Sequence, residues 1–173
     1  MAPQAFERLI LALATLAVLA AAALAGTERP LWYDELYTYY VSLQPTPGAT
    51  LGALLDGADN NPPVDYLLRQ ASMWALGPSE WAFRLPSALA FAAGLLALYG
   101  YVRRHGSAVG AFAAFALPIG TVAMRYSYEG RGYALLFAAA AASLLAWQRA
   151  TERPASVPRL ALLAGALTLG PFS

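Results

Sequence analysis

Two adjacent carboxylates, Asp34 and Glu35, stand in the stretch LWYDELYTYY (31–40), directly after the first long apolar run of the chain. A carboxylate within hydrogen-bond reach of a hydroxyl group can act as a general base and take up its proton. The pair also has a plainer interpretation, because acidic side chains in the first turn of a helix stabilise the helix dipole. This stretch alone leaves both interpretations open.

The composition of the chain decides which solvent this pair faces. Of the 173 residues, 59% are hydrophobic and only 12% are charged, whereas about half of an ordinary soluble domain is apolar and about a quarter is charged. The sequence therefore predicts an integral membrane protein. A net charge of +1 with scattered arginines excludes nucleic acid as a partner. The absence of cysteine excludes disulfides and thiolate metal sites.

Long apolar runs predict the membrane-spanning helices, since about 20 apolar residues are needed to cross a bilayer. We expect spans at 6–25, 84–102, 107–124 and 133–147, with a kink at Pro118, and the start of a fifth at 160–173. The predicted fold class is an all-α polytopic membrane helix bundle, with one membrane domain over 1–173. Because the fifth run is cut by the chain end, we expect a fragment that is incomplete at its C-terminus.

The first apolar run has a second interpretation as a cleaved signal peptide. The small residues Ala-Leu-Ala-Gly at 23–26 suit a signal peptidase. Glu7 and Arg8 leave the segment before the run nearly neutral, and further spans follow it. A retained membrane anchor is therefore the prediction.

A long loop, 26–83, separates the first two spans. Arginine placement in the short loops predicts a cytoplasmic N-terminus, which puts this loop outside. Loops of such length tend to be functional. Within it we expect short helices at 34–42, 50–55 and 62–76. The last carries Asp65 and Arg69 one turn apart, and its broad apolar face suggests that it lies on the membrane; that face comprises Val64, Leu67, Leu68, Ala71, Trp74 and Ala75.

Four stretches, taken in order, resemble one family of membrane enzymes. They are YDE (33–35), NPPVDYLL (61–68), SEWAFRLPS (79–87) and YEGRGYALL (128–136). Their order and their common place outside the membrane are similar to the GT-C superfamily of glycosyltransferases. The nearest branch includes the protein mannosyltransferases and the lipid A aminoarabinose transferases, or glycosyltransferase family 39 or 83-like proteins. The resemblance covers nearly the whole chain, and such proteins are usually much longer.

The resemblance implies a donor sugar linked to polyprenyl phosphate and assigns the role of base to Asp34. Glu35, one residue on, points to another side of a helix and is expected to support the site, for example by pairing with an arginine. Arg84, at the entrance of the second span, is expected to be structural and to pair with an acid. Tyr37 follows Asp34 by about one helical turn and is a candidate for contact with a sugar, although membrane surfaces are rich in tyrosine in any case.

A second group of candidates lies around the outer turn between the third and fourth spans. Arg131 stands at the depth of a lipid phosphate and can bind it through a bidentate guanidinium fork. Its alternatives are contact with lipid headgroups or a local pair with Glu129. Glu129 and the more weakly supported Arg125 complete the predicted substrate-binding group.

Asn60 and Asn61 are the departure from the family pattern, which often has histidine, or glutamate and lysine, before the proline. Asparagine amides coordinate metals weakly, so a divalent metal, which is one way to stabilise a leaving phosphate, is not favoured. Asn61 can hydrogen-bond substrate, or simply form the turn that starts a helix. The single histidine, His105, is expected in a cytoplasmic loop.

The expected function is an inverting glycosyltransferase on the outer face of a bacterial inner or plasma membrane, with a lipid, glycan or protein as acceptor. The alternatives are a transporter-like protein, an assembly partner, or an inactive truncated paralogue. Transporters place charges at the bilayer midplane, whereas the charges of this chain gather outside the predicted spans. This distribution favours chemistry at the membrane surface.

Overall fold

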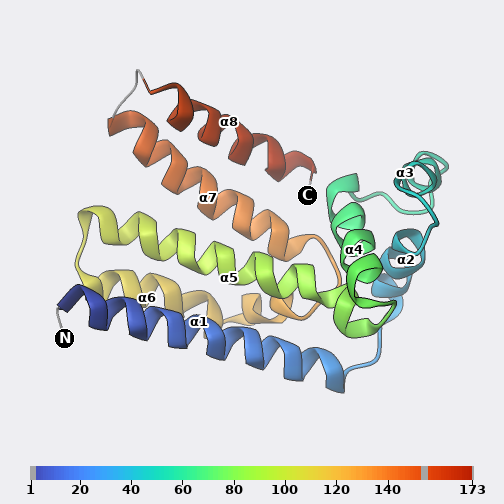
Figure 1. Ribbon diagram of the computed structural model, residues 1–173, viewed down its shortest axis with the longest axis horizontal. Helices are drawn as coiled ribbons and strands as arrows, with labels where there is room; N and C mark the ends of the chain where they lie inside the picture. Colours follow the sequence, from blue (N-terminus) through green and yellow to red (C-terminus); the bar gives the residue numbers. More distant parts are fainter. Residues whose placement is uncertain (1–2, 153–155, 173) are drawn as a thin grey trace.

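The computed structural model describes residues 3–152 and 156–172, and every regular element among them is a helix (Figure 1). The elements are α1 (Pro3–Glu28), α2 (Tyr33–Ser42), α3 (Pro47–Leu55), α4 (Pro63–Leu76), α5 (Glu80–His105), α6 (Ala108–Ile119), the 3₁₀ helix η1 (Val122–Ser127), α7 (Tyr133–Glu152) and α8 (Val157–Phe172). The predicted all-α bundle is confirmed. Three stretches in the described chain are long and apolar enough to cross a membrane, namely Gln4–Glu28, Glu80–His105 and Tyr133–Glu152.

Helix α5 is the centre of the bundle and packs against α1, α4, α6, η1 and α7. Its Phe91 and Leu95 are fully buried beside Val18 of α1 and Phe115 of α6. At its C-terminal end, Arg103 pairs with Glu7 of α1 and Arg104 pairs with Glu152 of α7. His105 is the last residue of this helix rather than part of a loop, and its Nε2 lies 3.4 Å from Glu152.

The segment 107–124 is a broken helix, where the sequence suggested one continuous helix with a kink. Helix α6 has 12 residues and ends just after Pro118, because proline lacks an N–H and disturbs the preceding turn. The chain restarts as η1, whose N-cap Thr121 accepts a hydrogen bond from the N–H of Ala123. At 1.5 Å per α-helical and 2.0 Å per 3₁₀ residue, the two pieces together reach about 30 Å.

Helices α2, α3 and α4 form a separate layer at the end of the bundle where α1 finishes and α5 and α7 begin (Figure 1). Their start signals are local. The Oγ1 of Thr46 accepts a hydrogen bond from the N–H of Ala49 at the start of α3. Proline occupies the first turn of α3 and of α4, where its missing N–H costs nothing. The predicted short helices of the long loop are confirmed.

Helix α4 buries its polar side. Asp65, Tyr66, Arg69, Gln70 and Met73 face inward and are buried. Most of the predicted apolar face is turned away from the bundle, and its exposed members are Leu68, Ala71, Trp74 and Ala75. An outward apolar face and a buried charged face are what a helix on a lipid surface requires.

Candidate functional site

Glu35 sits in the first turn of α2 with only 1% of its surface exposed. Its Oε1 accepts a hydrogen bond from Nε of Arg84 (2.9 Å) and its Oε2 one from Nη2 (2.6 Å). The N–H of Gly130 donates a further bond to Oε1 at 2.5 Å. Burial works to raise the pKa of Glu35, but the hydrogen bonds from Arg84 and Gly130 lower it further than burial raises it. The geometry thus gives Glu35 the arginine partner that its position suggested.

The guanidinium group of Arg84 is fully occupied. Besides Glu35, it donates hydrogen bonds to the carbonyl oxygens of Gly26, Arg29 and Pro30 at distances of 2.5 to 3.2 Å. It therefore holds together the end of α1, the start of α2 and the start of α5. This is the structural role predicted for Arg84.

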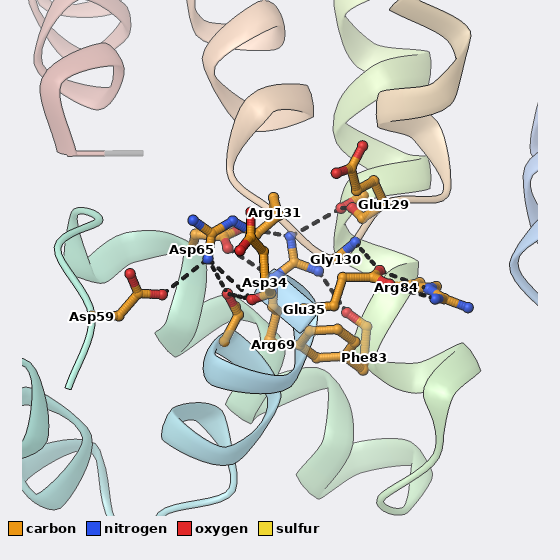
Figure 2. A network of polar contacts seen from close by, with 12 residues as sticks. Asp34, Glu35, Asp59, Asp65, Arg69, Phe83, Arg84, Glu129, Gly130 and Arg131 are labelled. Carbon is orange, nitrogen blue, oxygen red and sulfur yellow. Dashed lines mark hydrogen bonds and ion pairs between the residues drawn. The ribbon is translucent and has the colours of Figure 1, made fainter. Parts of the chain in front are cut away.

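A second buried ion pair lies within α4, and its arginine joins α4 to α5 (Figure 2). Arg69, which is fully buried, donates from Nε and Nη2 to the two carboxylate oxygens of Asp65 at 2.8 and 2.7 Å. It also donates to the carbonyl oxygen of Phe83 and to Oγ of Ser87. Ser87 in turn donates to the carbonyl oxygen of Glu129 at 2.6 Å. The chain of contacts fixes the turn that carries the second group of candidates.

Asp34 contrasts with its neighbour. Its backbone carbonyl oxygen accepts hydrogen bonds from Thr38 Oγ1 (3.5 Å) and from Arg131 Nη1 (3.2 Å). Its carboxylate, which is partly exposed, makes no hydrogen bond or ion pair with any described residue. This carboxylate is therefore available to a molecule from outside.

Arg131 approaches Asp34 from the turn before α7. Its Nη1 donates to the carbonyl oxygen of Asp34, to Oγ1 of Thr38 (3.0 Å) and to Oδ2 of Asp59 (2.9 Å). Its Nε and Nη2 have no hydrogen-bond partner among the described residues. One edge of the guanidinium is anchored, and the other edge is open.

Asp59 is the residue that the sequence reasoning missed. It precedes the Asn60-Asn61-Pro62 motif and is the ion-pair partner of Arg131. The sequence had suggested Glu129 as a possible partner of this arginine. Burial works to raise its pKa, but the Tyr66 hydroxyl, the N–H of Asn60 and the Arg131 guanidinium surround the carboxylate and lower that pKa overall. The sequence signal that could have identified Asp59 is its position directly before the Asn60-Asn61-Pro62 motif.

Glu129 is buried, and its Oε2 lies 3.9 Å from Nε of Arg125, which is beyond hydrogen-bonding distance. Burial raises the pKa of Glu129, and the nearby charge of Glu35 adds to the rise. Arg125 itself is exposed, with its guanidinium 6.0 Å from the centre of the Trp32 ring. These two residues are close to each other, but neither pairs with Arg131.

The last two candidates are Asn61, which contacts Asp59, and Tyr37, which lies on α2 about one turn after Asp34. Asn61 donates from Nδ2 to Oδ1 of Asp59 at 3.3 Å, so it belongs to the Arg131 cluster. Tyr37 is exposed and shares a hydrogen bond of 2.7 Å with the hydroxyl of Tyr33. Both tyrosines line an open groove of about 480 Å³, together with Leu36, Tyr40, Val41, Gln44, Ala53 and Ala58. In the described part of the chain, no three His, Asp or Glu side chains are grouped so that they could hold a metal ion.

No curated protein and no solved structure matches the chain. A family model described as dolichyl-phosphate-mannose-protein mannosyltransferase matches residues 60–171. The match includes Arg69, Arg84 and Arg131, and it begins after the pair Asp34 and Glu35. Together with the three apolar helices, it identifies an integral membrane protein. The chain therefore belongs to the dolichyl-phosphate-mannose-protein mannosyltransferase family, whose members are membrane glycosyltransferases of the GT-C type.

Proposed function

We propose that this protein transfers a sugar from a polyprenyl-phosphate-linked donor to a hydroxyl group of its acceptor, with inversion at the anomeric carbon. The observation that carries the proposal is the free carboxylate of Asp34. Its neighbours Glu35, Asp59 and Asp65 are all held in ion pairs, whereas Asp34 has none with any residue that the structure describes. A carboxylate left without a protein partner, on a frame of buried ion pairs, is suited to meet a substrate.

Asp34 is the proposed general base. It takes the proton from the acceptor hydroxyl as the hydroxyl oxygen attacks the anomeric carbon. The bond between that carbon and the phosphate oxygen breaks, and the phosphate leaves with the electron pair. A single displacement of this kind inverts the configuration. It needs no second carboxylate, which agrees with the engagement of Glu35 by Arg84.

Arg131 is the proposed ligand of the donor phosphate. Its open edge, Nε and Nη2, presents two parallel N–H directions, which match two phosphate oxygens. The anchored edge places the guanidinium beside the backbone of Asp34. Phosphate and base are thereby brought to one place, and the arginine stabilises the negative charge that develops on the leaving phosphate.

The other proposed contacts surround this pair. Tyr37 is proposed to support the sugar or the acceptor from the groove beside α2. The exposed Arg125 is proposed as a second contact for anionic substrate groups, while Glu129 and Asn61 are proposed to shape the site. The acceptor is a lipid, a glycan or a protein.

The proposed location is the outer face of a bacterial inner or plasma membrane, with the N-terminus in the cytoplasm. It rests on the position of the α2 to α4 layer at one end of the apolar helices. Arginines in the short connections between the apolar helices support the orientation.

The deciding experiment uses the full-length protein in membranes with radiolabelled polyprenyl-phosphate sugars. Asp34→Asn keeps the shape of the side chain and removes the base, so transfer is expected to fall by about 10²- to 10⁴-fold. The matched control is Asp56→Asn, an exposed acid at the end of α3, which is expected to keep full activity. Undiminished transfer by Asp34→Asn would eliminate Asp34 as the base. Absence of transfer by the wild type with every donor would favour a non-catalytic membrane protein.

A further inference from the structure

Asp59 lies in the loop between α3 and α4 and connects three parts of the site. Its Oδ1 accepts hydrogen bonds from the N–H of Asn60 (2.8 Å) and from Nδ2 of Asn61 (3.3 Å). Its Oδ2 accepts the bond from Nη1 of Arg131 at 2.9 Å. Only 14% of its side chain is exposed. The carboxylate is thus fixed by its own loop on one side and holds Arg131 with the other.

The surroundings of Asp59 strengthen this hold. Tyr66 of α4 lies beside it, with a fully buried hydroxyl that meets no partner in hydrogen-bonding geometry. Burial and the Asp59 carboxylate raise the pKa of Tyr66, so its hydroxyl stays neutral. Exclusion of water makes the attraction between Asp59 and Arg131 stronger than that of an exposed pair.

The way in which Arg131 is held decides which of its donors are open. Its Nη1 carries all three contacts, to Asp59, Thr38 and the backbone of Asp34. Without the carboxylate of Asp59, the guanidinium would lose its only ion-pair partner among the described residues. The carboxylate of Asp34 has no ion-pair partner among the described residues, and the backbone carbonyl of Asp34 already accepts a hydrogen bond from Arg131, so this carboxylate is a new partner to which the guanidinium can turn. A carboxylate that is paired with an arginine is less available to take the proton of the acceptor hydroxyl.

We infer that Asp59 is a positioning residue, which keeps the Nε and Nη2 edge of Arg131 open to the donor phosphate and keeps the guanidinium away from the carboxylate of Asp34. Asp59 touches neither the phosphate nor the acceptor in this arrangement and acts through Arg131. The inference rests on the proposed function and names the residue that separates its base from its phosphate ligand.

The test compares Asp59→Ala, Asp59→Asn and the control Asp56→Asn in the full-length protein. With a radiolabelled polyprenyl-phosphate sugar, Asp59→Ala is expected to raise the donor KM about tenfold, since a charge-assisted hydrogen bond is lost. Asp59→Asn keeps the shape of the side chain and covers the case in which Asp59→Ala does not fold. It should raise the donor KM less.

A binding measurement provides a readout that does not depend on turnover. Farnesyl phosphate, titrated calorimetrically into the purified full-length protein, is expected to bind about tenfold more weakly to Asp59→Ala than to the wild type. Equal binding by the wild type and both Asp59 variants would overturn the inference. So would a fall in kcat with an unchanged donor KM, because Asp59 would then act in the chemical step.

The failure of the inference can be told from the failure of the proposed function. If Asp34→Asn abolishes transfer while both Asp59 variants keep the wild-type donor KM and the wild-type affinity for farnesyl phosphate, only the positioning role is lost. If Asp34→Asn transfers sugar at the wild-type rate, the proposed base is wrong, and the positioning of Arg131 relative to it is wrong with it.

Discussion

Arg84 and Arg131 carry the same guanidinium group and lie on the two sides of the α2 N-terminus, yet they are held in opposite ways. Arg84 donates from all three nitrogens, to both oxygens of Glu35 and to three backbone carbonyls. Arg131 uses one nitrogen for its three hydrogen bonds, and its other two nitrogens have no partner within the described part of the chain. A saturated guanidinium can only hold the frame, whereas a half-saturated one can still bind a ligand.

The two acids of α2 repeat this difference. Glu35 accepts hydrogen bonds from Arg84, from the N–H of Gly130 and from the N–H of Trp32. The carboxylate of Asp34 accepts none from the described residues. Consecutive residues of a helix point about 100° apart, so one of the pair faces the frame and the other faces outward.

The largest effect is expected for Arg84→Ala. The change leaves Glu35 as a buried charge without an ion-pair partner, which costs about 3–5 kcal/mol of folding free energy and lowers the amount of folded protein in membranes. Arg84→Lys should rescue it poorly, because an ammonium group cannot replace five hydrogen bonds. Thermal unfolding in detergent measures the loss. Arg131→Ala is the comparison variant. It is expected to lose less stability than Arg84→Ala, because Asp59 is partly exposed and keeps its hydrogen bond from the N–H of Asn60, while the donor KM rises. Equal destabilisation by the two variants would contradict the difference between the two arginines.

An intermediate effect is expected for Gly130→Ala, which disturbs both regions at once. A Cβ at this position would overlap Cε1 of the Phe83 ring and lie 3.0 Å from Oε1 of Glu35. Overpacking of this kind costs about 1–3 kcal/mol, and it pushes the neighbouring Arg131 out of place. The melting temperature and the donor KM should both change. The control is Gly52→Ala, where nothing lies within 4 Å of the new Cβ, and it should neither lower the melting temperature nor raise the donor KM. A Gly130→Ala variant with the wild-type melting temperature would contradict the close packing of Gly130 against Phe83 and Glu35.

The smallest effect concerns Glu129, whose pKa is raised by burial, in contrast to the lowered pKa of Glu35. A raised pKa means that the folded protein binds the proton more tightly than the unfolded chain, so this residue adds stability as the pH falls toward the ordinary value of 4.5. Glu129→Gln should therefore melt slightly higher than the wild type at pH 8, by roughly 2–4 °C. The advantage should vanish near pH 4.5.

Glu35→Gln provides the opposite sign. The lowered pKa of Glu35 gives stability that is present above 4.5 and is lost as the pH falls through the folded-state value. At pH 8 the variant should melt lower than the wild type, and the difference should shrink in acid. Melting curves from pH 8 down to about pH 3 for both variants decide the matter. The same pH dependence for both variants would contradict the distinction between Glu35, which is hydrogen-bonded to an arginine, and Glu129, whose arginine lies beyond hydrogen-bonding distance.

The sequence was informative wherever local rules decide the structure. The start of α4 followed from proline in its first turn, and the separation of Asp34 from Glu35 followed from helix geometry. Helix α3, in contrast, begins at Pro47, three residues before the predicted start at 50, because Thr46 caps a helix there. The sequence predicted that Arg84 pairs with an acid, because a charge at the entrance of an apolar helix needs a partner, but it did not identify that acid as Glu35.

The remainder depended on contacts between distant parts of the chain. The pair between Asp59 and Arg131 spans 72 residues, and neither local spacing nor composition selects it. The break after Pro118 could equally have been a kink, because packing of the neighbouring helices decides how the freed backbone groups are satisfied. The outward apolar face of α4 agrees with its predicted place on the membrane, but the contacts of Arg69 with Phe83 and Ser87 of α5 could not be read from local sequence.

The ion pairs at the two ends of α5 also set a length. Arg84 binds Glu35 at one end, and Arg103 binds Glu7 at the other. At 1.5 Å per residue, these two arginines stand about 29 Å apart along the helix axis, which matches the hydrocarbon thickness of a typical bilayer, about 30 Å. The spacing of these two ion pairs therefore corresponds to one preferred thickness of the hydrocarbon core. In a thinner or thicker bilayer the helices must tilt together, because α1 is fastened to α5 at both ends.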